Sequence, residues 1–206
     1  MPNLDSPANN RLEVVDGRSG RRARNRDAVI DAVLKLYDDG IVEPTITDVV
    51  ERCGLSDRSV FRYFNDFDEL IRAAIERGHD RYAPLGRIHE FGKGPLDARV
   101  DNLLEQRLAM FETLSGPSRA IRHNIQRSEL LRSDLIRTRL LLRGQVQKQF
   151  EPELAAMDKD RGNQVLAALD VLLSFESYDL LRNDQSLTRS RAEAALRSAI
   201  IALVSS

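Results

Sequence analysis

Residues 45–70 carry the pattern that most limits what this chain can fold into. Thr45 is a good helix N-cap, and Asp48 three residues later comes close to completing a capping box. Apolar residues then recur at helical spacing until Gly54, which can end a helix in the left-handed conformation without a steric cost. Ser56 caps a second short helix. Two short helices joined by a tight glycine turn describe a helix-turn-helix.

The second helix of this unit is predicted to span residues 57–64 and to have two different faces. Val60 and Phe64 are four residues apart and share one side, which we expect to pack against the first helix. In such a unit the first helix supports the second, and the second lies in the DNA major groove. An ordinary three-helix core with a solvated polar face is the alternative that this pattern alone leaves open. The side chains that could bind phosphates and base edges are Asp57, Arg58, Ser59, Arg62 and Tyr63.

The same window resembles the DNA-binding signature of the TetR-type transcriptional regulators. The family pattern reads roughly T-hydrophobic-x-x-hydrophobic-A-x-x-x-G-hydrophobic-S, then x-x-(S/T)-hydrophobic-Y-x-(H/Y)-F, then x-x-K-x-x-L. The matching residues are Thr45, Ile46, Val49, Gly54, Leu55, Ser56, Ser59, Val60, Tyr63, Phe64 and Leu70. The resemblance implies an all-α fold, with an N-terminal three-helix helix-turn-helix DNA-binding domain and a C-terminal helical regulatory and dimerisation domain. It also adds Thr45 and Phe61 to the predicted DNA-binding residues.

Three positions depart from the family pattern. Val50 stands where a small alanine is usual, so the two helices are expected to lie slightly further apart. Phe61 replaces a tyrosine whose hydroxyl normally touches a phosphate, and Phe67 replaces a lysine that normally does the same. Either another part of the chain supplies these two phosphate contacts, or the affinity for DNA is low.

A run of arginines precedes the helix-turn-helix. Between residues 18 and 26 the chain has several arginines and no acidic residue. Such a run is usually a solvated tail or a frayed helix start. Directly before a helix-turn-helix it is better explained as an arm that enters the minor groove or follows the phosphates. We therefore predict that Arg21, Arg22 and Arg24 contact DNA.

The chain is predicted to divide into three parts. Residues 1–20 are expected to be a flexible tail, and residues 21–82 a helix-turn-helix domain with a linking helix. Residues 83–206 are expected to form a helical ligand-binding and dimerisation domain. It begins with a loop over residues 83–95 that has a short helical turn near Ile88. Apolar periodicity predicts further helices at residues 27–38, 67–81, 96–114, 118–126, 129–150, 164–181 and 188–204.

The last two predicted helices, residues 164–181 and 188–204, carry a second signal. The first is apolar around most of its circumference, and the second is rich in alanine, which permits close helix approach. In the resembled family these helices pair with their copies across a two-fold axis; a monomeric core is the alternative. A homodimer would present two recognition helices, so the target is predicted to be double-stranded DNA with an inverted repeat.

Nothing in the sequence indicates catalysis, a cofactor or a metal site. His79, His89 and His123 are widely separated, without a second ligand at metal spacing. No glycine-rich phosphate loop and no G-x-S-x-G motif is present. We therefore expect a protein that is not an enzyme, although a helical enzyme that borrowed this architecture is a rival interpretation.

Composition favours a cytoplasmic protein without a membrane partner. The net charge of −1 gives no sign of a nucleic-acid partner for the chain as a whole. The one cysteine, Cys53, excludes an internal disulfide and is typical of a reducing compartment. Residues 1–20 lack the apolar core of a signal peptide, and no uncharged apolar run approaches the ~18 residues that span a bilayer.

The resembled family usually holds a small-molecule pocket between the middle helices of its second domain. The residues predicted to line it here are Arg107, Met110, Phe111, His123, Arg127, Phe175 and Tyr178. The resemblance implies a dimeric repressor whose effector favours a wrong spacing of the recognition helices, so that the operator is released. The alternative is an effector-independent DNA-binding dimer whose C-terminal domain serves assembly or protein partners.

Overall fold

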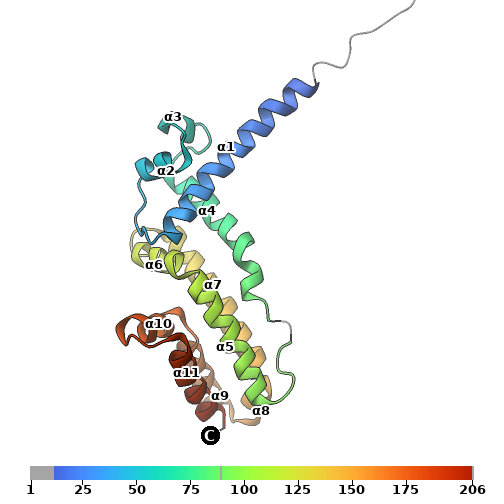
Figure 1. The fold of residues 1–206 in the computed structure, drawn as a ribbon. Helices are drawn as coiled ribbons and strands as arrows, with labels where there is room; N and C mark the ends of the chain where they lie inside the picture. The colour runs from blue at the N-terminus through green and yellow to red at the C-terminus, as the bar shows by residue number, and fades with distance from the viewer. Residues whose placement is uncertain (1–11, 89, 206) are drawn as a thin grey trace, which may run out of the picture. The chain divides into compact units, whose positions relative to one another are not determined.

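The computed structural model describes residues 12–88 and 90–205, and every regular element in these ranges is helical (Figure 1). The predicted all-α class is therefore confirmed. The chain divides into two compact units, Met1–His79 and Asp80–Ser206, which we call the N-terminal and the C-terminal unit. The sequence prediction placed the corresponding boundary at residue 82.

The N-terminal unit is built around one long helix. Its elements are α1 (Leu12–Asp38), α2 (Ile46–Cys53), α3 (Asp57–Val60) and the part of α4 (Phe67–Tyr82) that lies before the boundary. The C-terminal half of α1 packs against α2 and contributes about half of the buried apolar residues of the unit. Burial raises the pKa of Tyr37 to about 12, so its hydroxyl stays neutral. All of the α1 residues that were predicted to be buried are buried. They are Val29, Ile30, Val33, Leu34 and Tyr37.

Helix α1 begins much earlier than the sequence analysis predicted. The flexible tail was predicted over residues 1–20 and the helix start at Asp27, whereas α1 extends back to Leu12. Arginine is a good helix former and no proline interrupts the segment, so its two glycines are tolerated. The predicted tail is thus wrong for residues 12–20, and residues 1–11 lie outside the described part of the chain. Figure 1 shows this half of α1 projecting beyond α2 and α3.

The C-terminal unit is a bundle of helices with one apolar core. Large buried side chains of that core include Leu103, Leu108, Phe150, Leu169 and Ile200. Most helices are close to those predicted. The short turn, however, precedes Ile88, a further short helix starts around Pro152, and the helix predicted over residues 164–181 is divided. The elements are η1 (Ala83–Gly86), α5 (Leu96–Thr113), α6 (Ser115–Asn124), α7 (Glu129–Gln149), α8 (Glu151–Ala156), α9 (Lys159–Leu172), α10 (Phe175–Asp179), η2 (Leu180–Asp184) and α11 (Arg189–Val204).

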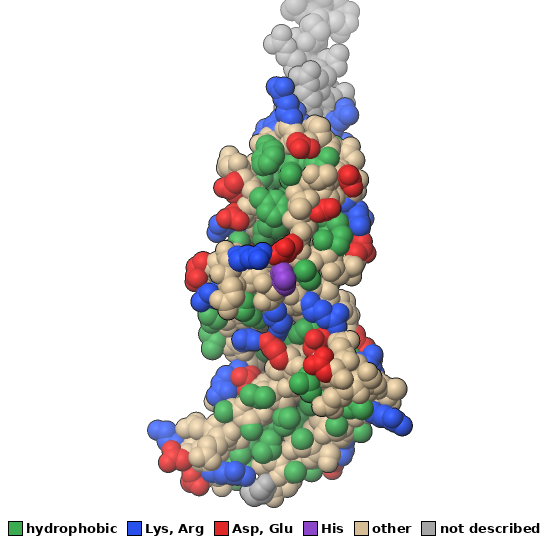
Figure 2. Space-filling model, turned by 90° about the vertical axis from the view of Figure 1, so that its left-hand side faces the viewer, with side chains coloured by type: hydrophobic (Ala, Val, Ile, Leu, Met, Phe, Trp, Pro, Cys, Tyr) green, Lys and Arg blue, Asp and Glu red, His purple; other side chains and the backbone are tan. Residues whose placement is uncertain are grey.

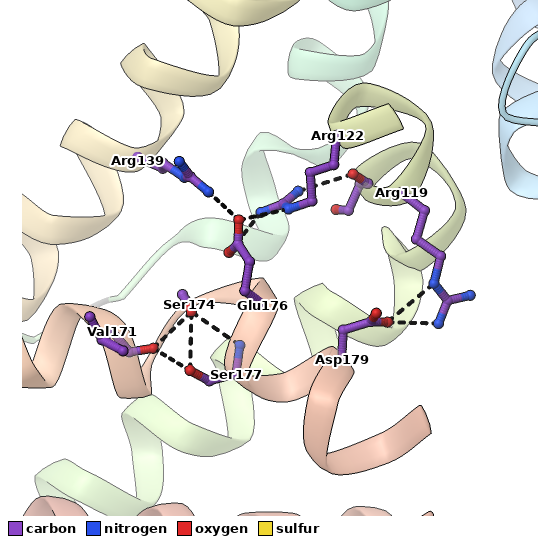
Figure 3. Close-up of polar contacts among 9 residues, drawn as sticks. Arg119, Arg122, Arg139, Val171, Ser174, Glu176, Ser177 and Asp179 are labelled. Carbon is purple, nitrogen blue, oxygen red and sulfur yellow. Dashed lines mark hydrogen bonds and ion pairs between the residues drawn. The ribbon is translucent and has the colours of Figure 1, made fainter. Parts of the chain in front are cut away.

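The helix predicted over residues 164–181 is in fact two helices. The chain leaves α9 after Leu172, and Ser174 caps α10 by accepting a hydrogen bond from the backbone N–H of Ser177 at 3.2 Å. The hydroxyls of both serines donate to the carbonyl of Val171 (Figure 3). Serine competes for backbone groups in this way, which favours a helix boundary. The break was hidden from the apolar pattern because residues on both sides of it are apolar.

Ion pairs join α10 to α6 and α7 (Figure 3). The guanidinium of Arg122 donates to both carboxylate oxygens of Glu176, at 2.9 and 3.1 Å, and Arg139 pairs with the same carboxylate. Arg119 binds Asp179 at 2.8 Å. Burial raises the pKa of Glu176, but the hydrogen bonds and charges of the two arginines outweigh burial and lower it to about 2.

We expect Glu176→Gln to lower the thermal stability at pH 7. A carboxylate with a lowered pKa in the folded state stabilises the fold above its unfolded pKa, and the contribution is lost as the pH falls through the folded pKa. Because the Glu176 side chain is 42% exposed, screening limits the loss to about 1 kcal/mol. The difference from the wild type should shrink from pH 4.5 towards about pH 2 in circular-dichroism melts.

Glu129→Gln is the control, because this carboxylate is largely exposed and its partners, Arg132 and the hydroxyl of Ser133, lie within one turn of the same helix. It should leave the melting temperature unchanged. Equal melting temperatures for Glu176→Gln and the wild type at pH 7 would contradict the role given to this ion-pair network.

Candidate nucleic-acid interface

Side-chain caps fix the two short helices of the N-terminal unit as predicted. The backbone N–H of Asp48 donates to Oγ1 of Thr45 at 3.3 Å, and that of Thr45 donates to the Asp48 carboxylate at 2.7 Å. The bond from the Thr45 backbone, with that from its hydroxyl, lowers the pKa of Asp48. Gly54 has φ +70°, and Ser56 accepts from the N–H of Ser59 at 3.3 Å. The helix-turn-helix geometry is therefore present.

Helix α3 is shorter than the predicted helix over residues 57–64. It ends at Val60, and the N–H groups of Arg62 and Tyr63 then bond to carbonyls three residues back instead of four. Val60 and Phe64 are both buried, as predicted. Of the predicted contact residues in this stretch, Ser59 is half-buried, and the exposed ones are Asp57, Arg58, Phe61 and Arg62.

Tyr63 does not lie on the exposed face, and its predicted position is wrong. The turn after Val60 has three residues, and at this pitch residues three apart lie above one another. Tyr63 therefore lies on the same side as the buried Val60. The residue is only 9% exposed. Its hydroxyl oxygen accepts hydrogen bonds from Nδ2 of Asn25 at 3.3 Å and from the guanidinium of Arg62 at 2.8 Å. The bond from Asn25 ties the turn after α3 to α1.

The arginines of α1 remain available to a partner. Arg21, Arg22 and Arg24 are exposed, and so is Arg58 on α3. None of the four forms a hydrogen bond or an ion pair with another residue in the described ranges. Arg77 of α4, by contrast, pairs with acids of α1. In the described part of this unit, unpaired positive charge therefore lies on α1 and at the start of α3.

Phenylalanine occupies the two positions at which the resembled family is expected to contact phosphates. Phe61 is 50% exposed and Phe67 is half-buried at the start of α4, and neither offers a hydrogen-bond donor on its side chain. The sequence analysis also missed Asn25, the residue that links α1 to Tyr63. Its position four residues before the buried Val29, on the same helix face, is the signal that could have identified it.

The residues predicted to bind an effector fall into two groups. His123 and Arg127 are exposed, so the structure does not bring them together with the others. The ring centroid of Phe111 lies 5.7 Å from that of Phe175 and 5.8 Å from that of Tyr178. Burial and a bond to Glu112 raise the pKa of Tyr178 to about 12. The buried members are Arg107, Met110, Phe111, Phe175 and Tyr178.

Arg107 is a buried cation within this second group. Its guanidinium donates to Oε1 of Gln145 at 3.2 Å and to the carbonyls of Leu142 and Leu173 at 3.4 Å. Burial lowers its pKa to about 10, and the charge of Asp170 opposes this shift. No carboxylate in the described ranges lies within ion-pair distance of it.

An open hollow of about 360 Å³ lies where α9, α10, η2 and α11 meet. Close to it, Val171 and Leu180 are exposed hydrophobic residues. The lower part of Figure 2 shows one face of the C-terminal unit. Hydrophobic side chains run across this face, and charged side chains gather at its margins. The hollow contains none of the predicted effector residues. Its lining consists of Leu172, Glu176, Ser177, Leu180, Leu181, Ala195 and Leu196.

The described ranges contain neither a membrane-spanning helix nor a metal-binding cluster. No helix there is both long enough and apolar enough to cross a membrane. No group of three or more histidine, cysteine, aspartate or glutamate side chains there is arranged to hold a metal ion.

Comparison with known proteins agrees with this architecture. No family model matches the chain. The HTH-type transcriptional repressor LfrR of Mycolicibacterium smegmatis is 29% identical over 92 residues, which are 44% of this chain and 47% of that protein. The match thus spans about half the length of that curated relative.

Solved structures match over most of the chain. A TetR-family transcriptional regulator from Streptomyces coelicolor superposes with a TM-score of 0.68 at 21% identity, covering 88% of this chain and 80% of that one. A putative TetR-family transcriptional regulator from Rhodococcus sp. gives 0.65 at 20% identity, covering 88% and 99%. The likeness that residues 45–70 indicated is therefore matched by the whole architecture, and the chain has the fold of the TetR-type transcriptional regulators.

Proposed function

We propose that this protein is a dimeric, sequence-specific DNA-binding transcriptional regulator that represses its target and leaves the operator when a small-molecule effector binds. The observation that carries the proposal is the capped α3 face, which stands beside the unpaired arginines of α1. The names of the matched proteins, a transcriptional repressor and two TetR-family regulators, support the same function.

Different parts of this surface suit different parts of DNA. Asp57 and Arg58 are exposed in the first turn of α3, where a carboxylate can accept from cytosine and a guanidinium can donate to guanine. Arg21, Arg22 and Arg24 are suited to phosphates, whose neutralisation releases counterions. Base reading thus falls to α3, and most of the salt-dependent affinity falls to α1.

Replacement of Arg21, Arg22 and Arg24 by alanine should weaken binding to every duplex. Each lost phosphate contact should reduce the slope of log K against log salt by about 0.9. The measurement is fluorescence anisotropy over a salt series, with one duplex recovered from a random pool and one unrelated duplex. Arg72→Ala, which removes an exposed arginine of α4, should leave the slope almost unchanged. A triple variant with the wild-type slope would refute the role of α1.

We infer that the dimer forms through α9 and α11, with the exposed apolar side chains near the hollow covered by the second copy. Val171 is 64% exposed in a single chain. The exposed alanines of α11, including Ala194, Ala195 and Ala202, allow two helices to approach closely. A two-fold interface is self-complementary, so a side chain of one copy can enter the hollow of the other and vice versa.

Val171→Asp should convert the dimer to a monomer, because it places a charge in the proposed interface without disturbing the core of the single chain. Light scattering coupled to size exclusion measures the mass, and anisotropy should show a much weaker affinity for an inverted repeat. Leu141→Asp is the matched control, since Leu141 on α7 is also 64% exposed. A dimeric Val171→Asp variant would contradict this choice of interface.

We infer that an effector binds among Arg107, Met110, Phe111, Phe175 and Tyr178 and that it carries a negative charge. The buried guanidinium of Arg107 supports this, because a carboxylate beside it would compensate a charge that burial makes costly. The exposed residues His123 and Arg127 are left out of the site. Binding would favour one arrangement of the dimer over another, as differential affinity requires.

A panel of aromatic and aliphatic carboxylates, each tested beside its amide, should include compounds that raise the melting temperature and weaken DNA binding. Arg107→Met should remove the preference for the acid over the amide, since it keeps most of the side-chain volume without the charge. If no member of a broad small-molecule panel changes either property, the effector-independent dimer, with a C-terminal domain for assembly or protein partners, replaces this proposal.

A further inference from the structure

One face of α1 changes character along its length. Val29 and Val33 on this face are fully buried in the core of the N-terminal unit. Asn25 and Arg22 lie four and seven residues before Val29, and these spacings keep them on the same side of the helix. Helix α1 continues beyond the core (Figure 1), and the hydrogen bond from Asn25 to Tyr63 places Asn25 beside the turn that follows α3.

The hydroxyl of Tyr63 is the point where the two elements meet. Its oxygen accepts from Asn25 and from Arg62, and no described residue accepts its own proton. The hydrogen bonds from Asn25 and Arg62, with the charges of Arg62 and Arg22, lower the pKa of this hydroxyl. The guanidinium of Arg62 and the O–H of Tyr63 are thus in contact, and Arg22 lies one turn of α1 before Asn25 on the same helix face.

Neighbouring contacts keep this group in place and leave its charge uncompensated. The guanidinium of Arg26 lies 5.0 Å from the centroid of the Phe64 ring, which fixes α1 against the end of α3. The nearby acids Asp27 and Glu69 are engaged with Arg77 and Asn65. In the described ranges no carboxylate pairs with Arg22 or Arg62.

We propose that Arg22, Arg62 and the hydroxyl of Tyr63 form a composite site for one backbone phosphate of DNA in each half-site. The inference rests on the proposed DNA-binding function and specifies how the contacts missing at Phe61 and Phe67 are replaced. Phosphate oxygens accept strong, charge-assisted hydrogen bonds from guanidinium groups, and the phenol adds a third donor. Asn25 is a positioning residue, because its amide holds the phenol oxygen and so directs the O–H outwards.

The site requires the arginine segment to be helical instead of an extended arm. A rigid α1 places Arg22 at a fixed position relative to α3, so a phosphate bound there fixes the register of α3 in the groove. Arg24 lies two residues from Arg22, about 200° around the helix, and therefore faces away from the site. This difference provides a control with the same charge on the same helix.

The test combines three variants with chemically altered DNA. An inverted-repeat duplex recovered from a random pool is made with a neutral methylphosphonate at one backbone position at a time. For the wild type and for Arg24→Ala, we expect that a methylphosphonate at one position in each half-site, the phosphate bound by the composite site, weakens binding about three- to tenfold. For Tyr63→Phe and Arg22→Ala, the affinity for unmodified DNA should fall, and modification at that same position should cause much less further loss.

Every outcome decides the proposal. If the loss of affinity caused by each variant and the loss caused by each modified phosphate simply multiply at all positions, the composite site is wrong. In that case, binding of the wild type to an inverted repeat would still leave the proposed function intact. If the wild type selects no duplex, the proposed function itself fails. Arg22→Ala changes an exposed residue, so it decides the question even if Tyr63→Phe does not fold.

Inorganic phosphate distinguishes a free anion from the DNA backbone. In the absence of DNA, we expect that adding ~10 mM phosphate changes the melting temperature of neither the wild type nor Tyr63→Phe. The reason is that an open site binds a single small anion weakly. Stabilisation of the wild type alone by inorganic phosphate would mean that the site serves a free anion and would overturn the assignment to DNA.

Discussion

The burial of Val60 and Phe64 is the constraint on which the DNA-binding surface depends. These two side chains fix which side of the segment after Gly54 faces the core, and therefore which side faces outwards. The caps at Thr45 and Ser56 only start the helices; apolar burial orients them. Because α3 is a single turn long, it has little stability of its own, and the packing of its buried side must hold the outward side chains in place.

Much of this arrangement could be predicted from the sequence because it depends on local chemistry. The capping box at Thr45, the left-handed Gly54 and the cap at Ser56 are each determined by a few neighbouring residues, and all three are present. The buried face of α1 was equally predictable from apolar spacing. These are the features for which the residue type at one position limits the backbone to few conformations.

What the sequence analysis got wrong depends on contacts between distant residues or on competing turn geometries. The bond between Asn25 and Tyr63 joins residues far apart in the chain. The spacing of Asn25 from Val29 indicates its helix face, but it does not identify its partner. The tightening after Val60, which turns Tyr63 inwards, is a small change in helix pitch that an apolar period does not resolve. The boundary at Ser174 was hidden because apolar residues flank it, and the helical start of α1 because arginine suits a helix and a tail alike.

The two units contribute to function in different ways. In the described part of the N-terminal unit, several exposed arginines have no ion pair, so their charge remains available for a partner. In the C-terminal unit, arginines such as Arg122 and Arg139 form ion pairs with Glu176, so they stabilise the packing of α10 next to the proposed dimer face. The buried Arg107 is the exception there, and its charge is the feature that favours a negatively charged effector.

Selection of bound DNA from a random pool, followed by sequencing, tests the central claim most directly. If α3 is presented twice by a symmetric dimer, the recovered sequences should share an inverted repeat whose half-sites are separated by about 34–36 Å or a multiple of that distance. Recovery of sequences without a shared motif at low ionic strength, or with a single unrepeated half-site, would contradict the account.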